Sequence, residues 1–322
     1  IEIATTRPET LFGDQAIAIH PDNEKLKHLI GRRAIIPLTD REIPVIADEH
    51  ADPDKGTGAV KITPAHDFDD WDVGVRHNLT PINILTPDAR LNDNPVVPEK
   101  YRGMDRFTAR DAVVADIDAA GLLVKIEDKV IPTPYSERGG VVVEPYLTDQ
   151  WFVDAEKLAT AAINVVADGR ITFMPEHRYN LYMSWMKNIR PWPISRQLWW
   201  GHRIPAWYDS DGNIYVAETA ADAINQSGGK ELVRDSDVLD TWFSSALWPF
   251  STLGWPDDTP ELKKYYPTDL LYTGADIIFF WVARMIMMGM YVMGDVPFKT
   301  VNFHGLVRDS KGQKMSKTNG NG

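Results

Sequence analysis

The spacing of hydrophobic and polar positions divides the chain into two regions that meet near residue 145. From residue 1 to 145, short β-rich runs alternate with a few helical stretches, which is typical of a β-rich, mixed α/β domain. Apolar alternation predicts strands over 16–19, 33–37, 43–47 and 59–63. Helices are predicted over 67–77 and 105–120, and Gly121 follows the second one, where glycine commonly ends a helix.

The second region, residues 146–322, follows a segment rich in proline and glycine at 132–145 and contains most of the tryptophans. Helical spacing predicts helices over 155–166 and 176–187. A predicted strand over 269–272 runs through a glycine turn into a helix that starts after Ala275. Strand, glycine turn and helix are typical of a nucleotide-binding sheet, so we expect half of such a sheet here.

The most apolar run, 277–293, predicts a buried helix rather than a membrane span. Asp276 opens it and Arg284 lies in its middle, where a charge is costly inside a bilayer. The chain of 322 residues has no cysteine, which excludes disulfides and thiolate zinc sites and favours an intracellular setting. The net charge of -12 argues against a nucleic-acid coat protein but leaves room for a local basic groove.

A threonine-rich segment, Thr5–Thr10, places hydroxyl groups and the Arg7 guanidinium around a proline. Such a loop can hold a phosphate or a ribose. The same pattern is also an ordinary start of a helix, because proline and glutamate are common in a first helical turn.

A second polar segment, 56–71, runs from a Gly-Thr-Gly turn through a short strand into the start of a helix. Lys61 and Thr63 leave the same face of the strand, and Asp67 and Asp70 share one face of the helix. A cation, a hydroxyl and two carboxylates can therefore converge. Alternatively, the carboxylates only cap the helix and face its positive end.

A third polar segment, His304–Thr318, contains the run Lys314-Met315-Ser316-Lys317, a basic loop able to face phosphates. An exposed, flexible lysine loop is the simpler interpretation of that run alone. Together with Gly274-Ala275-Asp276 and His304-Gly305, however, it resembles the signature loop of the class I aminoacyl-tRNA synthetases. The Thr5–Thr10 and 56–71 segments together resemble the editing domain inserted in the members of that family specific for valine, isoleucine and leucine.

The resemblance implies a β-rich mixed α/β editing domain over 1–145, inserted in a Rossmann-like nucleotide-binding domain of which only the second half, 146–322, is present. In the family the editing domain hydrolyses mischarged tRNA, and Asp70 would hold the α-ammonium of the wrong amino acid. The other implied editing residues are Arg7 and Thr10 near the terminal adenosine and ester, and Lys61, Thr63 and Asp67 around the side-chain pocket.

The resemblance also implies an ATP site in the second region. Gly274 and Asp276 would contact the ribose, and His304 would lie by the adenine. Lys314 and Lys317, assisted by Ser316, would stabilise the charge that develops on pyrophosphate as the adenylate forms. A glycine after a strand allows a ligand to approach the backbone closely, which agrees with this assignment.

Tryptophan-rich segments at 192–208, 237–245 and 247–256 resemble the valine-specific members of the family more than the others. By that resemblance Trp200, Val238 and Trp242 would wall a valine side chain, although tryptophan-rich stretches are more often core. Valine synthetases are themselves a standard example of an apolar pocket that cannot strongly reject threonine, which makes hydrolytic correction necessary.

The implied ligands of the complete enzyme are valine, tRNA(Val), and ATP with Mg²⁺; we expect no zinc, no membrane association, a monomer and a cytoplasmic location. The His-Ile-Gly-His-type motif is absent, Pro193 stands where the family has cysteine, and residues 318–322 depart from the signature. We therefore expect an internal fragment, cut at both ends, that cannot form the adenylate. Two alternatives stay open: an isoleucine or leucine synthetase fragment, or an inactive tRNA-binding piece.

Overall fold

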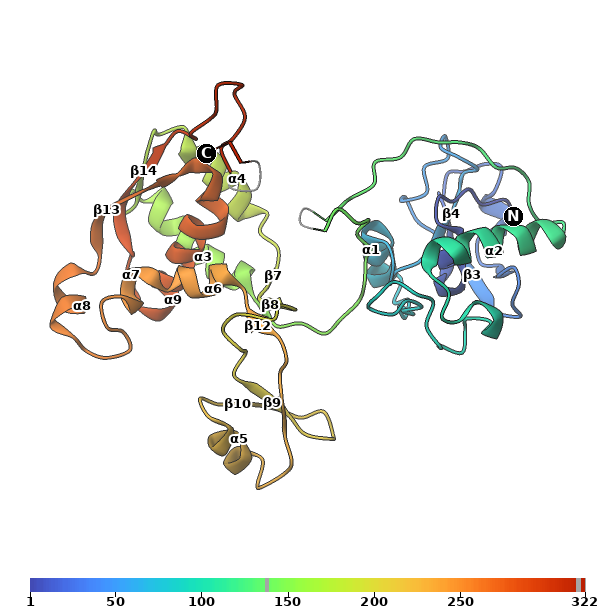
Figure 1. Cartoon of the computed structure of the whole chain (residues 1–322). Coiled ribbons are helices and arrows are strands. Elements are labelled where there is room, and N and C mark those ends of the chain that lie inside the picture. Colours follow the sequence, from blue (N-terminus) through green and yellow to red (C-terminus); the bar gives the residue numbers. More distant parts are fainter. Residues whose placement is uncertain (137–138, 317–319, 322) are drawn as a thin grey trace. The chain divides into compact units, whose positions relative to one another are not determined.

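The computed structural model describes residues 1–136, 139–316 and 320–321, and it divides the chain into two compact units, Ile1–Thr148 and Asp149–Gly322 (Figure 1). Both units combine helices with strands, which confirms the mixed α/β class.

A four-stranded sheet forms the centre of the first unit, in the order β2-β3-β1-β4. Its strands are β1 (Ala16–Ile19), β2 (Arg33–Ile35), β3 (Glu42–Ala47) and β4 (Ala59–Ile62). β1 runs parallel to β3 and antiparallel to β4, and all four of its residues are buried, as expected for a strand covered on both faces. The four predicted strands are thus confirmed, with β2 ending two residues earlier than predicted.

Three helical segments position the polar side chains of this unit: the 3₁₀ helix η1 (Pro8–Gly13), α1 (Phe68–Arg76) and α2 (Arg106–Ala119). The side chains of Asp67 and Asp105 accept from backbone N–H groups at the starts of α1 and α2, which is ordinary N-capping. Gly121 follows α2 with a φ of 68°, a conformation that glycine adopts at little cost, so the predicted stop is confirmed. Shorter 3₁₀ turns lie at η2 (Lys27–Leu29) and η3 (Glu99–Tyr101).

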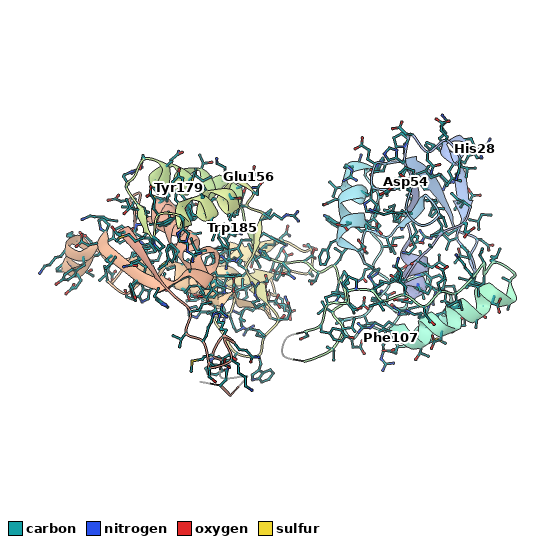
Figure 2. All side chains as sticks on the ribbon, turned by 90° about the horizontal axis from the view of Figure 1, so that it is seen from above. His28, Asp54, Phe107, Glu156, Tyr179 and Trp185 are labelled. Carbon is teal, nitrogen blue, oxygen red and sulfur yellow. The ribbon has the colours of Figure 1, made fainter. Side chains whose placement is uncertain are left out.

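A three-stranded parallel sheet, in the order β13-β14-β6, organises the second unit. Its strands are β13 (Thr268–Gly274), β14 (Phe298–His304) and β6 (Thr172–Met174), and its core also contains α3 (Ala155–Ala167), α4 (Arg178–Lys187) and α9 (Ala283–Val292). Tyr179 and Trp185 of α4 pack against this core (Figure 2). Leu271 is buried while Leu270 and Tyr272 are exposed, so the helices cover one face of the sheet.

The helix predicted after Ala275 begins irregularly, with the 3₁₀ turn η4 (Ala275–Ile277) and the π turn η5 (Ile278–Val282). Within η5, Phe279 stacks on Trp185 at 4.8 Å, and Trp281 Nε1 donates to the Ser245 carbonyl at 3.0 Å. Among the described residues, Ala275–Val292 is the one helix long and apolar enough to cross a membrane. Because 44% of it is buried and a core helix meets the same criterion, this is weak evidence for a membrane span.

A small lobe of the second unit, which the sequence pattern did not predict, contains the antiparallel sheet β10-β9-β11 and α5 (Figure 1). Its elements are β9 (Ala206–Tyr208), β10 (Ile214–Val216), α5 (Ala220–Gln226) and β11 (Val233–Arg234). The remaining short elements are β5 (Phe152–Val153), β7 (Trp192–Pro193), β8 (Ser195–Arg196), β12 (Val238–Leu239), α6 (Thr241–Ala246), α7 (Trp248–Ser251) and α8 (Pro260–Tyr265).

Candidate functional site

The ammonium of Lys61 on β4 is held in the first unit by three oxygen acceptors. Its Nζ donates to Thr10 Oγ1 at 3.0 Å, to Asp14 Oδ1 at 3.0 Å and to Thr63 Oγ1. Thr63 Oγ1 in turn donates to Asp14 Oδ1 at 2.6 Å. An ammonium has three N–H donors, so these contacts fix its direction. Burial raises the pKa of Asp14, and the charge of Lys61 opposes that rise.

Asp70 lies next to this cluster on the first turn of α1. Its Oδ2 accepts from the backbone N–H of Thr63 at 2.8 Å, and its Oδ1 lies 3.6 Å from His50 Nε2. Burial raises the pKa of Asp70 to about 6, and the Thr63 N–H, which lowers it, does not offset the burial. A cation placed next to this buried carboxylate would stabilise its ionised form, which desolvation alone disfavours.

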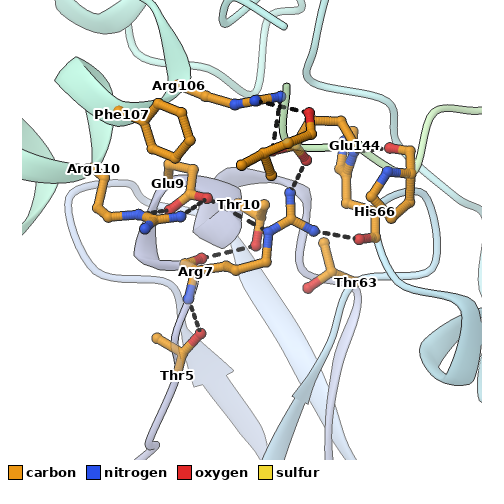
Figure 3. Close-up of polar contacts among 12 residues, drawn as sticks. Thr5, Arg7, Glu9, Thr10, Thr63, His66, Arg106, Phe107, Arg110 and Glu144 are labelled. Carbon is orange, nitrogen blue, oxygen red and sulfur yellow. Dashed lines mark hydrogen bonds and ion pairs between the residues drawn. The ribbon is translucent and has the colours of Figure 1, made fainter. Parts of the chain in front are cut away.

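The guanidinium of Arg7 forms a second polar cluster, in which Nη1 donates to the His66 carbonyl at 2.6 Å and Nη2 donates to Glu144 Oε2 (Figure 3). Glu9, which is fully buried, receives two bonds of 2.8 Å from Arg110 and lies 3.5 Å from Arg7 Nε. The two clusters are joined, because Thr10 Oγ1 donates to the Arg7 carbonyl at 3.0 Å.

The imidazole of His66 is a buried, neutral link between distant segments. Its Nε2 faces the backbone N–H of Ile84 at 3.0 Å and therefore accepts, which leaves the proton on Nδ1, 3.3 Å from the Pro145 carbonyl. Burial lowers the pKa of His66 to about 4, and the Pro145 carbonyl opposes that shift. His66 thus holds the backbone around Arg7 without carrying charge at neutral pH.

The structure links five of the six predicted editing residues through direct hydrogen bonds, in the order Arg7, Thr10, Lys61, Thr63 and Asp70. The sixth, Asp67, is exposed and caps α1, with its Oδ1 accepting from Asp69 N at 2.9 Å. Thr10 and Thr63 are each 1% exposed, so they support Lys61 from beneath rather than facing solvent.

Sequence reasoning missed several members of these clusters: Glu9, Asp14, Arg106, Arg110 and Glu144. Asp14 lies four residues after Thr10, between Gly13 and Gln15, and its acceptor contact with Lys61 joins positions 47 residues apart. The contacts of Glu9 and Glu144 join residues 101 and 137 positions apart, and no local pattern predicts such pairs.

The predicted ATP residues of the second unit meet where β13 and β14 end. Gly274 pairs with His304 across the two parallel strands, and Lys314 Nζ donates to Asp276 Oδ2 at 2.6 Å. That bond lowers the pKa of Asp276. A Cβ added at Gly274 would lie 2.6 Å from Asp276 Oδ1 and 3.5 Å from His304 Cε1, so glycine keeps this space open.

The basic loop folds back as a turn around Asp309, whose Oδ1 accepts from the backbone N–H groups of Lys311 and Gln313 at 2.9 and 2.8 Å. Ser316 N donates to Asn321 Oδ1 at 2.9 Å. Lys317 lies outside the described residues. Lys314, which belongs to this loop, lies beside the predicted ATP residues because its Nζ donates to Asp276.

The predicted valine residues differ in their surroundings. Val238 is buried against Gly201, where an added Cβ would lie 2.9 Å from Val238 Cγ2. Trp242 packs partly buried against the core around Trp192, with its ring 5.8 Å from that of Phe280. Trp200 is 88% exposed, so its ring does not share the burial of the other two.

Asp240, at the start of α6, is a buried carboxylate that the sequence did not identify. It accepts from Trp192 Nε1 at 2.9 Å and from Arg284 Nη1 at 3.1 Å, and Arg196 Nη2 lies 3.2 Å away. The guanidinium of Arg284 also lies 3.9 Å from the centroid of the Trp192 ring. A cavity of about 380 Å³ beside this group is lined partly by Trp192 and Arg284, away from the predicted ATP residues.

Within the described part of the chain, no group of three or more His, Cys, Asp or Glu side chains is arranged to hold a metal ion.

A family model described as tRNA synthetases class I (I, L, M and V) matches residues 38–322. The chain is 59% identical over 324 residues to a valine--tRNA ligase of Francisella tularensis subsp. tularensis (strain SCHU S4 / Schu 4), covering 100% of this chain and 35% of that protein. It is 53% identical over 358 residues to a valine--tRNA ligase of Rhodopseudomonas palustris (strain ATCC BAA-98 / CGA009), covering 100% of this chain and 37% of that protein.

Among solved structures, the chain is similar to Mycobacterium tuberculosis methionyl-tRNA synthetase bound by methionyl-adenylate, with a TM-score of 0.39 and 21% identity. That match covers 59% of this chain and 32% of the other. The chain spans little more than a third of the length of the curated relatives it matches, 35% and 37% of the two named above.

Proposed function

This chain belongs to the class I tRNA synthetases of the isoleucine, leucine, methionine and valine group, and from that premise we propose that it is part of a valine--tRNA ligase. Its first unit is an editing domain that hydrolyses threonyl-tRNA(Val). Its second unit is the later half of a Rossmann-like aminoacylation domain. In the complete enzyme that domain attaches valine to tRNA(Val) with ATP.

The observation that carries this proposal is the buried Asp70 carboxylate beside a fixed cation. Its Oδ1 is too far from His50 Nε2, at 3.6 Å, to accept a hydrogen bond from it. The α-ammonium of an aminoacyl ester supplies a cation in direct contact with this carboxylate, whereas the Lys61 ammonium is bonded to Thr10, Asp14 and Thr63. Ammonium and carboxylate together fix the amino acid at one end, which orients its ester group.

Hydrolysis of an aminoacyl ester requires orientation more than a strong nucleophile, because the ester is already activated. A water oxygen attacks the carbonyl carbon, the bond to the ribose oxygen breaks, and a proton of the water passes to that oxygen, so that the free amino acid and the tRNA hydroxyl are formed. The positive charges of Lys61 and Arg7 stabilise the negative charge that develops on the carbonyl oxygen. Asp14, Thr10 and Thr63 keep the Lys61 ammonium in one direction.

The second unit fits an adenine nucleotide at the ends of β13 and β14. The missing side chain of Gly274 leaves a space between Asp276 and His304, and Lys314 lies at its edge. In the complete enzyme the amino-acid carboxylate would displace pyrophosphate from the α-phosphorus of ATP, and Mg²⁺ would be held mainly by the phosphates and by water. Lys314 is poised to exchange its carboxylate partner for a phosphate oxygen.

The names of the relatives support valine over isoleucine and leucine, since both proteins named above are valine--tRNA ligases. A valine enzyme needs a small apolar pocket in its aminoacylation domain, and Trp200, Val238 and Trp242 remain the residues predicted to wall it. Such a pocket admits threonine, which has nearly the shape of valine, and this explains the need for a hydrolytic site.

Release of threonine from threonyl-tRNA(Val) by this chain tests the proposal, with an Asp70→Ala variant and valyl-tRNA(Val) as controls. We expect release from the threonyl ester that depends on Asp70 and largely spares the valyl ester. A folded chain that binds tRNA in a salt-dependent way but releases no threonine would contradict the editing function and favour an inactive tRNA-binding piece. Release of a different amino acid from its own mischarged tRNA would favour an isoleucine or leucine enzyme.

A further inference from the structure

We propose that Glu144 is a positioning residue for Arg7, and that it acts through Arg7 on the hydrolysis proposed above, on which this inference rests. Glu144 lies near the end of the first unit, 137 residues from Arg7 in the sequence. Neither the motifs nor the family resemblance points to it.

One carboxylate serves two guanidinium groups at this position. Glu144 Oε2 accepts from Arg7 Nη2, and Glu144 Oε1 lies 3.1 Å from Arg106 Nη1 (Figure 3). Arg106 also donates to the Val142 carbonyl at 3.0 Å, and His66 Nδ1 contacts the Pro145 carbonyl at 3.3 Å. The segment 142–145 is thereby bonded to Arg106 of α2 and to His66, whose backbone carbonyl is the other acceptor of Arg7.

Two contacts determine the plane of the Arg7 guanidinium: Glu144 on Nη2 and the His66 carbonyl on Nη1. Glu9 contributes less, because both of its oxygens are bonded to Arg110 at 2.8 Å and Arg7 Nε lies 3.5 Å away. The Glu144 and Arg106 side chains are 11% and 10% exposed. Charge-assisted bonds are stronger in such shielded surroundings than in water.

Burial raises the pKa of Glu144, while the charges of Arg7 and Arg106 oppose the rise. The cluster holds three guanidinium groups, Arg7, Arg106 and Arg110, and two carboxylates, Glu9 and Glu144, which leaves one positive charge. Removing the charge of Glu144 would leave two positive charges beside the site. If Glu144 acted only through its charge, removing that charge would strengthen the binding of the anionic tRNA and would not slow turnover. If Glu144 positions Arg7, removing it lowers turnover instead.

Glu144→Gln separates these roles with little change of shape. Glu144 uses one oxygen for Arg7 and the other for Arg106, and glutamine replaces one of these oxygens by an NH₂ group, which then faces a guanidinium donor instead of accepting from it. Glu42→Gln is the matched control, because Glu42 accepts from Arg33 Nε at 2.8 Å in the same unit and both side chains are more than half exposed.

The first arm of the experiment uses the full chain and needs no catalysis. Side-chain ¹⁵N NMR of the guanidinium groups, with Arg7→Lys to assign the Arg7 signals, reports how firmly Arg7 is held. We expect separate, slowly exchanging Nη signals in the unchanged chain and in Glu42→Gln, and their loss in Glu144→Gln. Arg7 signals that do not change in Glu144→Gln would overturn the proposal.

The second arm measures release of threonine from threonyl-tRNA(Val) under multiple-turnover conditions. Positioning predicts that kcat falls about 10- to 100-fold in Glu144→Gln while KM stays equal or decreases, in a chain that remains folded at the assay temperature. A kcat equal to that of Glu42→Gln, or faster release, would overturn the proposal, the latter because Glu144 would then block Arg7. If the unchanged chain releases no threonine, the proposed function fails, and the NMR arm still decides the role of Glu144.

Discussion

The pH dependence of threonine release follows from the state of Asp70. Only the ionised carboxylate can hold an ammonium, and burial raises the pKa of Asp70 to about 6. The ionised fraction falls from about 0.9 at pH 7 to about 0.1 at pH 5, so kcat/KM should decrease about tenfold between these values. The profile of kcat/KM reports the free enzyme, in which no substrate ammonium shifts this equilibrium.

Two variants assign this acid limb to Asp70. Asp70→Asn removes a charge-assisted bond worth about 1.5–3 kcal/mol, so kcat/KM at pH 7 should fall roughly 10- to 150-fold and the acid limb should disappear. His50→Gln, which changes the neighbour 3.6 Å from Asp70 and leaves the carboxylate in place, should retain the limb. The His66 imidazole, with a pKa of about 4, titrates too low to produce it.

The assay follows labelled threonine released from threonyl-tRNA(Val) between pH 5 and pH 8, after subtraction of spontaneous ester hydrolysis at each pH. A kcat/KM that is flat from pH 7 to pH 5 would refute the role given to Asp70. An acid limb that survives unchanged in Asp70→Asn would refute it equally.

Three further perturbations test the structure around both sites. The pKa of His66 lies below its ordinary value of 6.5, so the stability that the neutral imidazole contributes is present above pH 6.5 and is lost as the pH falls towards 4. In urea unfolding, the excess free energy of unfolding of the unchanged chain over His66→Gln should therefore shrink by about 2–3 kcal/mol between pH 7 and pH 4.5. Lys61→Met leaves Asp14 buried without its cation and should destabilise the first unit by about 3 kcal/mol, whereas adding Asp14→Asn should restore the unfolding midpoint but not threonine release. Gly274→Ala should weaken ATP binding, measured by calorimetry, without lowering the melting temperature by more than a few degrees, because the new Cβ would meet a carboxylate oxygen at 2.6 Å.

Local patterns predicted the four strands of the first sheet and the helices α1 to α4, because short-range physics determines them, whereas β14, β6 and the short elements between Trp192 and Tyr265 were not predicted. Asp105 caps α2 and Gly121 ends it, and both positions are evident from the sequence alone. The alternation of apolar residues in β3 likewise reflects which side chains face the core. The π turn at Ile278–Val282 was not predictable, because it depends on aromatic partners supplied by other elements.

The polar clusters were predictable only in part. Lys61 and Thr63 were found because their spacing of two places them on one strand face. Asp14 and Glu144 were missed because their partners are 47 and 137 residues away. A pattern within a short window carries no information about such pairs, so the sequence indicated a pocket without its supporting charges.

The most direct test of the account compares hydrolysis of threonyl-tRNA(Val) and valyl-tRNA(Val) by the same preparation of this chain. The account predicts that the threonyl ester is hydrolysed at least about tenfold faster, and that the threonyl rate falls towards spontaneous hydrolysis in Asp70→Ala, which loses the carboxylate that holds the ammonium. Equal rates for the two esters, or a threonyl rate no greater than spontaneous hydrolysis, would contradict the proposal that the first unit corrects mischarged tRNA(Val).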